Sequence, residues 1–510
     1  MKVKLKVILF TLLSLLLGWA EANEGLTPGS QWWEIYEGDK KIAYCHAVIS
    51  QIDEGEEILS QMRQDWRYRF TWFGVEQDIS SSVLVHVDRE LKPRYFCTKT
   101  RSGKHQKEVE GKVSGCSIGI TISSFGVTYE MKVNLPSNTY FYETIGKLLV
   151  KEELIAGNRY DFKVLNLETL QMEDLTWVVK GKTEISVLGE ELICFYIEEE
   201  REGINRMLWM NEQGEIIKEK VGGITSLCLR TNEGEATSFG PMADLTFHSR
   251  VKTSGLLSDA YRRKASRIKL KIKGKNVEKF IIEDERQKVL KRRRVADGVV
   301  LTYDLRSVDF ETDKSLDLPI GSEVFPEYLE ESPYVWSRQK EIQEQAREIA
   351  GEERNAFQVA MKIADWICST ISHKSLAMVL TPIDTMETKE GKCFDKAILF
   401  SSLARSLGIP TKICLGIVYG NDGVFTYHAW NEIYVSQWVA IDPSGLQFPL
   451  SAVYLKLSEK QPEESEQLGV NISALEVKIS GFGFPIWPCI GAFISMFVLL
   501  WAWLVRKKVE

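Results

Sequence analysis

One stretch, residues 391–444, constrains this 510-residue chain more than any other. It carries Cys393 directly before an apolar segment, and then His428 and Asp442, each within a short strand-like run. His428 lies 35 positions after Cys393, and Asp442 lies 14 positions after His428. A thiol, an imidazole and a carboxylate are the groups that a nucleophilic cysteine site requires. The fold must bring these three residues together if the stretch is to do chemistry.

The sequence predicts that Cys393 lies on the first turn of a helix. No glycine or proline interrupts the chain from Phe394 to Leu407, the apolar residues there recur with helical period, and Gly408 ends the pattern. The positive end of a helix dipole lowers the pKa of a thiol, and Lys392 adds a formal charge beside it. Backbone N–H groups of the first turn are suited to hold a developing oxyanion.

The relation between His428 and Asp442 depends on the register of a predicted hairpin. A two-residue turn would put Asn431 opposite Asp442, and the carboxylate would then lie on the sheet face opposite to His428, because side chains alternate. A three-residue turn or a bulge instead puts Asp442 opposite Trp430, on the face of His428. We expect this second register. Trp430 then either forms one wall of the substrate cleft or belongs to the hydrophobic core.

Three segments resemble the transglutaminase-like superfamily of papain-fold cysteine enzymes: GKCFDKAILFSSLARSLGIPTKICLGIVY, YHAWNEIYV and WVAIDPS. The resemblance covers residues 322–457 and implies an α+β catalytic domain of a bacterial-type member that is exported and anchored to the membrane. It implies that Cys393 is the nucleophile, that His428 is the general base and acid, and that Asp442 orients His428. Members of this family pass an acyl group to an amine or to water, so they include cross-linking enzymes, proteases, amidases and inactive relatives.

Two functions follow from this resemblance. In the first, the protein is a cysteine enzyme that performs acyl transfer or hydrolysis at amide bonds of a protein or peptide substrate, such as a component of the cell envelope. In the second, the domain is degenerate and the protein is a non-catalytic binding or scaffold protein of the envelope. Reactivity of Cys393 distinguishes the two. Neither function requires a metal or another cofactor, and the nine cysteines show no paired spacing that predicts a metal site or a disulfide.

Both ends of the chain indicate export to a membrane. Residues 1–22 have a basic start, a short apolar run and a small-residue cleavage site, which are typical of a signal peptide. Residues 485–505 are apolar and long enough for a transmembrane helix, and the basic tail 506–510 follows them. The positive-inside rule places that tail in the cytoplasm. We therefore expect a single-pass protein of the cell membrane, with its catalytic body outside the cytoplasm.

The rest of the chain predicts mostly strands. Residues 23–245 indicate an antiparallel β-rich domain, in which the turn Gly38-Asp39 forms a hairpin and residues 142–154 form a helix. Residues 255–320 predict a small β domain or extension, since residues 267–272 alternate strictly. Residues 458–484 are polar and acidic, as in a stalk.

Helical spacing in the catalytic region predicts helices over 337–350, 355–370 and 382–389, with a loop at 372–381 that borders the substrate cleft. The net charge of −7, from 64 basic and 71 acidic residues, argues against a nucleic-acid partner. The local run from Lys291 to Arg294 is expected to be an exposed turn between strands.

Overall fold

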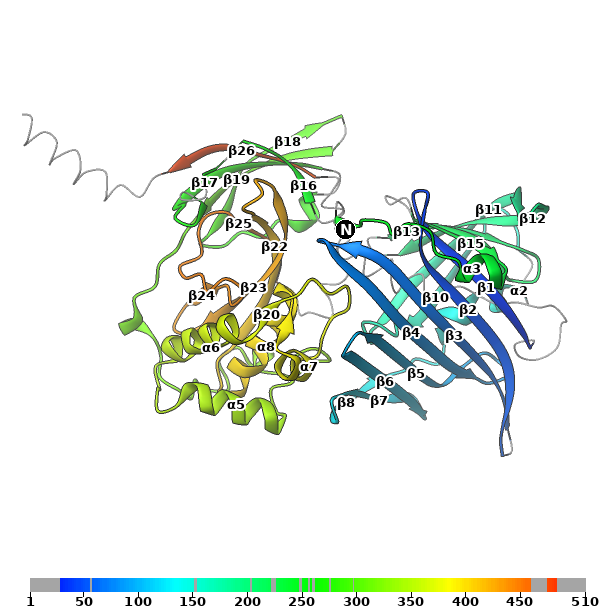
Figure 1. Ribbon diagram of the computed structural model, residues 1–510, viewed down its shortest axis with the longest axis horizontal. Coiled ribbons are helices and arrows are strands. Elements are labelled where there is room, and N and C mark those ends of the chain that lie inside the picture. Colours follow the sequence, from blue (N-terminus) through cyan, green and yellow to red (C-terminus); the bar gives the residue numbers. More distant parts are fainter. Residues whose placement is uncertain are drawn as a thin grey trace, which may run out of the picture.

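The computed structural model describes residues 28–55, 57–150, 154–201, 204–221, 226–246, 250–255, 257–258, 262–274, 277–296, 298–459 and 475–483. The predicted signal peptide (1–22), transmembrane helix (485–505) and basic tail (506–510) lie outside these ranges. Within them, no helix is both long enough and apolar enough to cross a membrane. Two large sheets dominate the described residues, and they lie side by side in Figure 1.

The first sheet has fifteen strands in the order β8-β7-β6-β5-β4-β3-β2-β1-β15-β14-β13-β12-β11-β10-β9. All neighbours are antiparallel except β9 and β10, so the expected antiparallel β-rich N-terminal region is confirmed. The strands are β1 (Gly29–Glu37), β2 (Lys40–Glu54), β3 (Glu57–Trp72), β4 (Val75–Val87), β5 (Pro93–Ser102), β6 (His105–Ser114), β7 (Ser117–Ser124), β8 (Val127–Asn134), β9 (Thr139–Phe141), β10 (Arg159–Leu165), β11 (Met172–Val187), β12 (Glu190–Arg201), β13 (Ile204–Met210), β14 (Ile216–Val221) and β15 (Ser226–Thr231).

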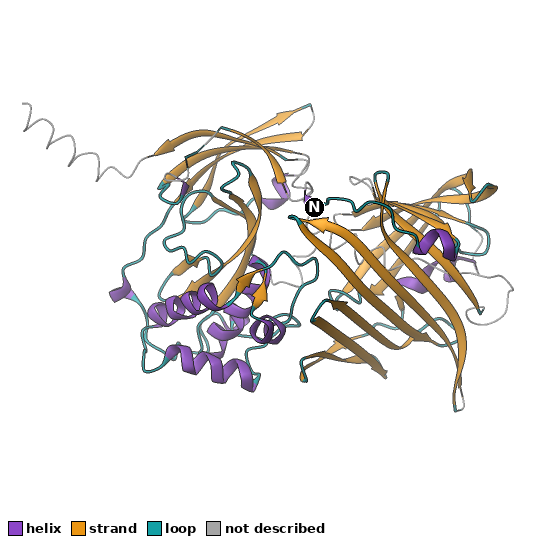
Figure 2. Ribbon diagram, viewed as in Figure 1, coloured by secondary structure: helices purple, strands orange, loops and turns teal. Residues whose placement is uncertain are grey.

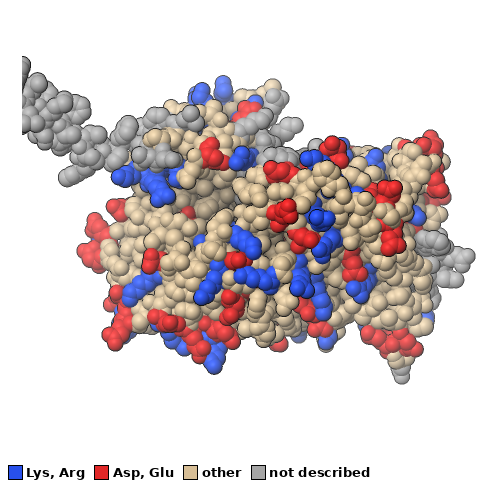
Figure 3. All heavy atoms as spheres, in the orientation of Figure 1, with Lys and Arg blue, Asp and Glu red and all other residues tan. Residues whose placement is uncertain are grey.

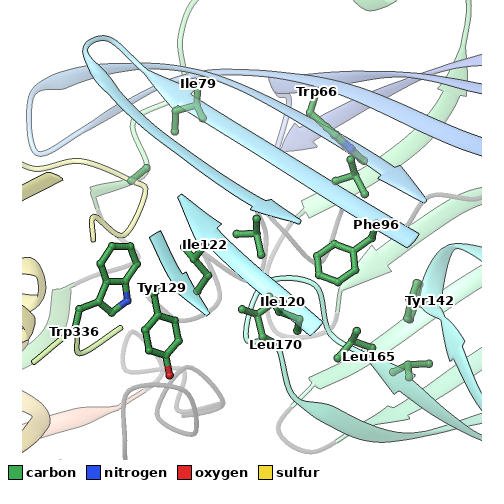
Figure 4. Packing of buried hydrophobic residues seen from close by; sticks show 14 of the residues in the cluster. Trp66, Ile79, Phe96, Ile120, Ile122, Tyr129, Tyr142, Leu165, Leu170 and Trp336 are labelled. Carbon is green, nitrogen blue, oxygen red and sulfur yellow. The ribbon is translucent and has the colours of Figure 1, made fainter. Parts of the chain in front are cut away.

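Short local signals explain how this sheet forms. Glu37 pairs with Lys40 across the predicted turn, and Gly38 has a φ of +64°, which glycine adopts without strain. The inward side chains of each strand recur at every second residue, as Trp66, Tyr68 and Phe70 do on β3. They build an apolar core between the curved strands, part of which Figure 4 shows around Trp66 and Phe96.

A short helical segment follows β9, where the sequence predicts one helix over 142–154. The structure has a 3₁₀ turn, η2 (Tyr142–Thr144), and then α2 (Ile145–Val150). Another helix, α3 (Glu233–Thr237), follows β15 and packs on β1 and β2. The hydroxyl of Tyr142 contacts the buried ion pair of Arg206 and Glu199, so this segment closes a polar network inside the first sheet.

The second sheet has the order β18-β19-β17-β26-β16-β23-β22-β25, and β24 pairs with β23. The predicted small β extension is therefore continuous with the sheet of the catalytic region, because β16 joins β26 to β23. The strands are β16 (Arg250–Ser254), β17 (Arg267–Gly274), β18 (Gln287–Val295), β19 (Gly298–Arg306), β22 (Thr411–Tyr419), β23 (Phe425–Tyr434), β24 (Trp438–Ile441), β25 (Tyr454–Ser458) and β26 (Glu476–Gly483).

Four helices lie beside β22 and β23, at the end of this unit farthest from β17–β19 (Figure 2). They are α5 (Lys340–Ala350), α6 (Ala356–Thr370), α7 (Pro382–Thr388) and α8 (Cys393–Ser406). Each agrees closely with a helix expected from apolar spacing. The strand pair β20 (Ser372–His373) and β21 (Glu390–Gly391) and the 3₁₀ turns η4 (Val277–Phe280), η5 (Thr312–Lys314) and η6 (Pro326–Tyr328) complete the described elements.

Two expectations about this unit are wrong. Residues 458–484 are not a stalk throughout, because Glu476–Gly483 is strand β26, whose residues Val477 and Ile479 are buried while Lys478 is exposed. The run from Lys291 to Arg294 is not a turn but part of β18, an edge strand of the sheet. In both cases a polar composition concealed a strand, since only one face of β26 is apolar and residues 290–294 of β18 are all exposed.

The two units share one apolar cluster. Tyr129 of β8 stacks on Trp336 with ring centroids 5.8 Å apart, and Figure 4 shows the two rings together at the boundary. The same cluster continues into Ile342 of α5 and Ile363 of α6. The N-terminal sheet is thus packed firmly against the helical side of the second unit.

Candidate active site

Cys393 is the first residue of α8 and is partly buried. The backbone N–H of Lys392 donates to Asp395 Oδ2 at 3.0 Å, which caps the start of the helix. Gly391 allows the chain to approach this carboxylate closely, since a Cβ there would lie 3.1 Å from the Cβ of Asp395. The structure therefore places Cys393 at the positive end of α8, as the sequence predicts.

The side chain of Lys392 has a different role from the one expected. Its Nζ donates to the carbonyl oxygens of Leu376 (3.0 Å) and Met378 and lies 3.8 Å from Asp395 Oδ1. The ammonium group therefore binds the loop 374–381. Asp395 Oδ1 also accepts from the N–H of Leu380 at 3.1 Å, so the residues that flank Cys393 hold this loop in place.

His428 and Asp442 meet through the expected hairpin register. Asn431 pairs with Ile441 and Tyr434 pairs with Trp438, which leaves a three-residue turn and puts Asp442 in line with Trp430. His428 Nε2 lies 2.8 Å from Asp442 Oδ2. The sequence-based register is confirmed, and it is the one that allows this contact.

Two further donors fix the carboxylate of Asp442. The hydroxyl of Tyr454 donates to Oδ2 at 2.8 Å, and the N–H of Ser444 donates to Oδ1 at 2.8 Å. Burial alone would raise the pKa of Asp442, but the charge of His428 and these hydrogen bonds lower it. Asp442 is therefore an ionised acceptor, and Nε2–H of His428 is the donor.

The charges around His428 favour the imidazolium. Burial would lower its pKa, but the negative charges of Asp442 and of the Cys393 thiolate, with hydrogen bonds to both, raise the pKa of His428 to about 10. Because Asp442 occupies Nε2, Nδ1 is the ring nitrogen left for the sulfur. The structure thus brings together all three residues singled out from the sequence, with His428 between the other two.

Lys396 is a charged group of this site that sequence reasoning missed. It lies one helical turn after Cys393 on α8 and is only 3% exposed. Burial lowers the pKa of Lys396, while the negative charges of Cys368, Asp442 and Cys393 act in the opposite direction. The i to i+3 spacing from the cysteine was a signal that could have identified it.

Trp430 belongs to the core beneath the site rather than to an open cleft wall. It is 2% exposed, and its ring lies 6.4 Å from that of His428 and 5.5 Å from that of Tyr454. A Cβ at Gly416 would lie 2.8 Å from the Trp430 ring and 2.0 Å from the carbonyl oxygen of Leu455. Only glycine fits at this point, directly opposite His428 in the sheet.

The N-terminal sheet also holds the loop 374–381. The amide of Gln77 on β4 donates to the carbonyl of Ser375 at 2.9 Å and accepts from the N–H of Ala377 at 3.0 Å. His105 of β6 lies between two carboxylates, 2.7 Å from Asp384 and 3.2 Å from Glu390. His105 thus has partners in the second unit, a contact that its lone position in the sequence did not reveal.

Comparisons with known proteins give a family for part of the chain. Residues 343–443 match the family model described as the transglutaminase-like superfamily. No curated protein matches. This span contains Cys393, His428 and Asp442 and the helices α6–α8.

Three solved structures show a distant likeness to this chain. One is a candidate cysteine protease from Cytophaga hutchinsonii, with 16% identity and a TM-score of 0.30, covering 43% of this chain and 85% of that chain. Another is a β-barrel-like protein from Brucella abortus, with 10% identity and a TM-score of 0.32, covering 41% and 98%. A candidate protease from Parabacteroides distasonis has 10% identity and a TM-score of 0.19, covering 79% and 71%. At these scores the likenesses carry no functional inference, and the assignment rests on the family match: residues 343–443 form a transglutaminase-like superfamily domain.

Proposed function

We propose that the protein is an exported, membrane-anchored cysteine enzyme that performs acyl transfer or hydrolysis at an amide bond of a protein or peptide. One observation carries this proposal: His428 lies between Cys393 and Asp442, with its pKa raised to about 10 by both. A charged imidazolium next to a sulfur stabilises the thiolate, which is the nucleophilic form. The match of residues 343–443 to the transglutaminase-like superfamily supports the same reading.

The proposed reaction has two steps. The Cys393 thiolate attacks the amide carbonyl, a C–S bond forms, and the C–N bond breaks as His428 gives its proton to the leaving amine. Water or a second amine then attacks the thioester, His428 takes its proton, and the C–S bond breaks to restore the thiolate. The positive end of α8 stabilises negative charge that develops on the carbonyl oxygen in both steps.

Alkylation of the full-length chain by iodoacetamide tests the activated thiolate. Cys116, which is free and exposed between β6 and β7, lies within the same molecule and serves as the reference. At pH 6 an ordinary thiol is thiolate only to roughly 0.3%, so Cys393 should react on the order of tenfold faster than Cys116 despite its lower exposure. His428→Ala should remove this advantage, and Cys393→Ala should remove the label.

The result also separates the enzyme from the alternative of a non-catalytic envelope scaffold. If Cys393 reacts no faster than Cys116 and follows the same pH dependence, the activated thiolate is absent and the scaffold is favoured. If Cys393 is activated, a peptide carboxamide incubated with and without a primary amine distinguishes hydrolysis from transamidation by the product formed.

A further inference from the structure

The second sheet presents one strongly basic face. On β17 the odd-numbered residues Arg267, Lys269, Lys271 and Lys273 point outward, while the residues between them are apolar and buried. The alternation is strict along the strand, so a single face collects every cation.

Cross-strand pairing brings further cations to the same face. Lys478 of β26 lies opposite Lys271, and Lys271 pairs on its other side with Thr302 of β19. Thr302 in turn lies opposite Lys291 of β18, and the neighbouring row adds Arg293. Directly paired residues point to the same side of a sheet, so these basic side chains form one surface.

We call this surface the basic face. Its cations are Arg267, Lys269, Lys271, Lys273, Lys288, Lys291, Arg293, Arg306 and Lys478. Among the described residues of these four strands it carries two carboxylates, Asp304 and Glu476, so nine positive and two negative charges give +7. The whole chain has a net charge of −7. Figure 3 shows blue side chains along the edge of the molecule that β18 and β26 occupy in Figure 1.

Most of these cations have no acidic partner among the residues that the structure describes. Asp304 is shared by Arg267 (2.6 Å) and Arg306 (2.8 Å), and Glu476 lies 3.7 Å from Lys273. Within the part of the chain that the structure describes, no ion pair is formed by the other six: Lys269, Lys271, Lys288, Lys291, Arg293 and Lys478. Like charges directly opposite each other, such as Lys271 and Lys478, destabilise a sheet. Folding alone therefore gives no reason for the pattern.

Protection of the sheet edge explains only part of the basic face. Lysine and arginine on an edge strand prevent pairing with other chains, which accounts for Lys291 and Arg293 on β18. It does not account for β17, which is paired on both sides with β19 and β26. Lys269 and Lys271 of this interior strand are therefore left to an anionic partner outside the described residues.

The position of β26 indicates which partner. The strand ends at Gly483, and the predicted transmembrane helix begins at residue 485, two residues later. Two extended residues span at most about 7 Å, so a bilayer entered there lies beside the end of β26 and its neighbour β17. We propose that the basic face docks on the anionic phospholipid headgroups of the membrane in which the chain is anchored. This inference rests on the proposed anchor but not on the proposed chemistry.

Docking would fix the active site relative to the membrane. The basic face and His428 belong to one sheet, because β26 pairs with β16 and β16 pairs with β23. A sheet held flat against the headgroups gives His428 and Cys393 a constant height and orientation. Substrates in the adjoining layer of the envelope would then be favoured over those that diffuse freely.

Lysine footprinting of the full-length chain in lipid nanodiscs tests this proposal. The discs contain phosphatidylcholine alone or phosphatidylcholine with phosphatidylglycerol, and acetylation is read by mass spectrometry. Each basic residue at an anionic surface strengthens binding by about fivefold, so Lys273, Lys288 and Lys291 should be acetylated at least about fivefold more slowly in the anionic discs. High salt should remove the difference.

Charge reversal gives a matched comparison. A triple variant, Lys269→Glu with Lys271→Glu and Lys478→Glu, should restore acetylation of the remaining lysines of the basic face. The control combines Lys112→Glu, Lys132→Glu and Lys340→Glu, which change the net charge by the same amount on other elements, and it should not restore acetylation. Equal acetylation in both discs overturns the proposal. Protection by soluble polyphosphate with none by anionic lipid also overturns it, and assigns the face to a soluble polyanion. Alkylation of Cys393 in the same variants stays unchanged whichever result is found, so a failure here is distinct from a failure of the proposed enzyme.

Discussion

Replacing Asp442 by asparagine would reveal how the site keeps His428 charged. Asp442 Oδ2 lies 2.8 Å from His428 Nε2, and the carboxylate is ionised because its pKa is lowered by the surrounding charge and donors. Asparagine has the same size, and its Oδ1 can still accept from the N–H of Ser444, which lies 2.8 Å from Asp442 Oδ1. The substitution therefore removes a charge with little change in shape.

The expected shift follows from the contact. An opposite charge at this distance changes a pKa by about 1–3 units, which corresponds to about 1.4–4 kcal/mol. The pKa of His428, about 10 in the native protein, should fall to roughly 7–9 in Asp442→Asn. Since the folded-state pKa lies above the ordinary 6.5, the stability that the imidazolium contributes is complete below pH 6.5 and is lost as the pH rises through about 10. In the variant this loss should begin at lower pH.

Carbon NMR of histidine labelled at Cε1 measures the shift, with the His428 signal assigned by its absence in His428→Gln. Tyr454→Phe is the control, because it removes a donor to the same Oδ2 at 2.8 Å but keeps the charge. There the pKa of His428 should stay within about half a unit. An unchanged titration of His428 in Asp442→Asn would refute the electrostatic account and leave Asp442 as a steric support.

Three further predictions concern residues around the site. Gln77→Ala removes two hydrogen bonds to the loop 374–381, so alkylation of Cys393 by a peptide-like probe should slow about tenfold, while alkylation by iodoacetamide stays unchanged. Gln61→Ala, on β3, is the control. Equal slowing with both reagents would contradict a role of Gln77 in positioning this loop. Asn431→Ala breaks the bonds from β23 to Ala397 and Ser401 of α8 and should lower the free energy of unfolding by about 1–3 kcal/mol in urea titrations; a loss below that range would show that the two elements are held otherwise. Burial raises the pKa of Glu143 to about 7, so the native state is destabilised increasingly as the pH rises from 4.5 to 7. Glu143→Gln should therefore raise the free energy of unfolding by about 3 kcal/mol at pH 8 and leave it unchanged at pH 4. An equal effect at both pH values would contradict this account.

Local sequence signals predicted the centre of the site because its geometry is set locally. The uninterrupted apolar period after Cys393 specified α8. The alternation of the next two strands required a three-residue turn if Asp442 was to reach the face of His428, and Tyr434 pairs with Trp438 accordingly. The helical repeat and the alternation of side chains along a strand are set within a few residues, so a single sequence is enough to predict them.

Contacts between distant segments escaped the same reasoning. The sequence places the charge of Lys392 beside Cys393, but it does not reveal that the ammonium binds the carbonyls of Leu376 and Met378, which only the folded loop brings near. The polar composition of residues 458–484 predicts a stalk and conceals strand β26, whose partner β17 lies about two hundred positions earlier. Pairing partners at such separations leave no trace in local periodicity.

The loop 374–381 shows why the first sheet matters to the chemistry of the second unit. Lys392 and Asp395 hold it from the side of Cys393, and Gln77 holds it from the N-terminal sheet. His105 adds contacts to Asp384 and Glu390 at the two ends of the segment that leads to Gly391. The position of the nucleophile therefore depends on residues about three hundred positions earlier. A fragment limited to residues 322–457 would keep Cys393, His428 and Asp442 but lose the two hydrogen bonds from Gln77 to the loop beside them, so its reactivity would understate that of the whole protein.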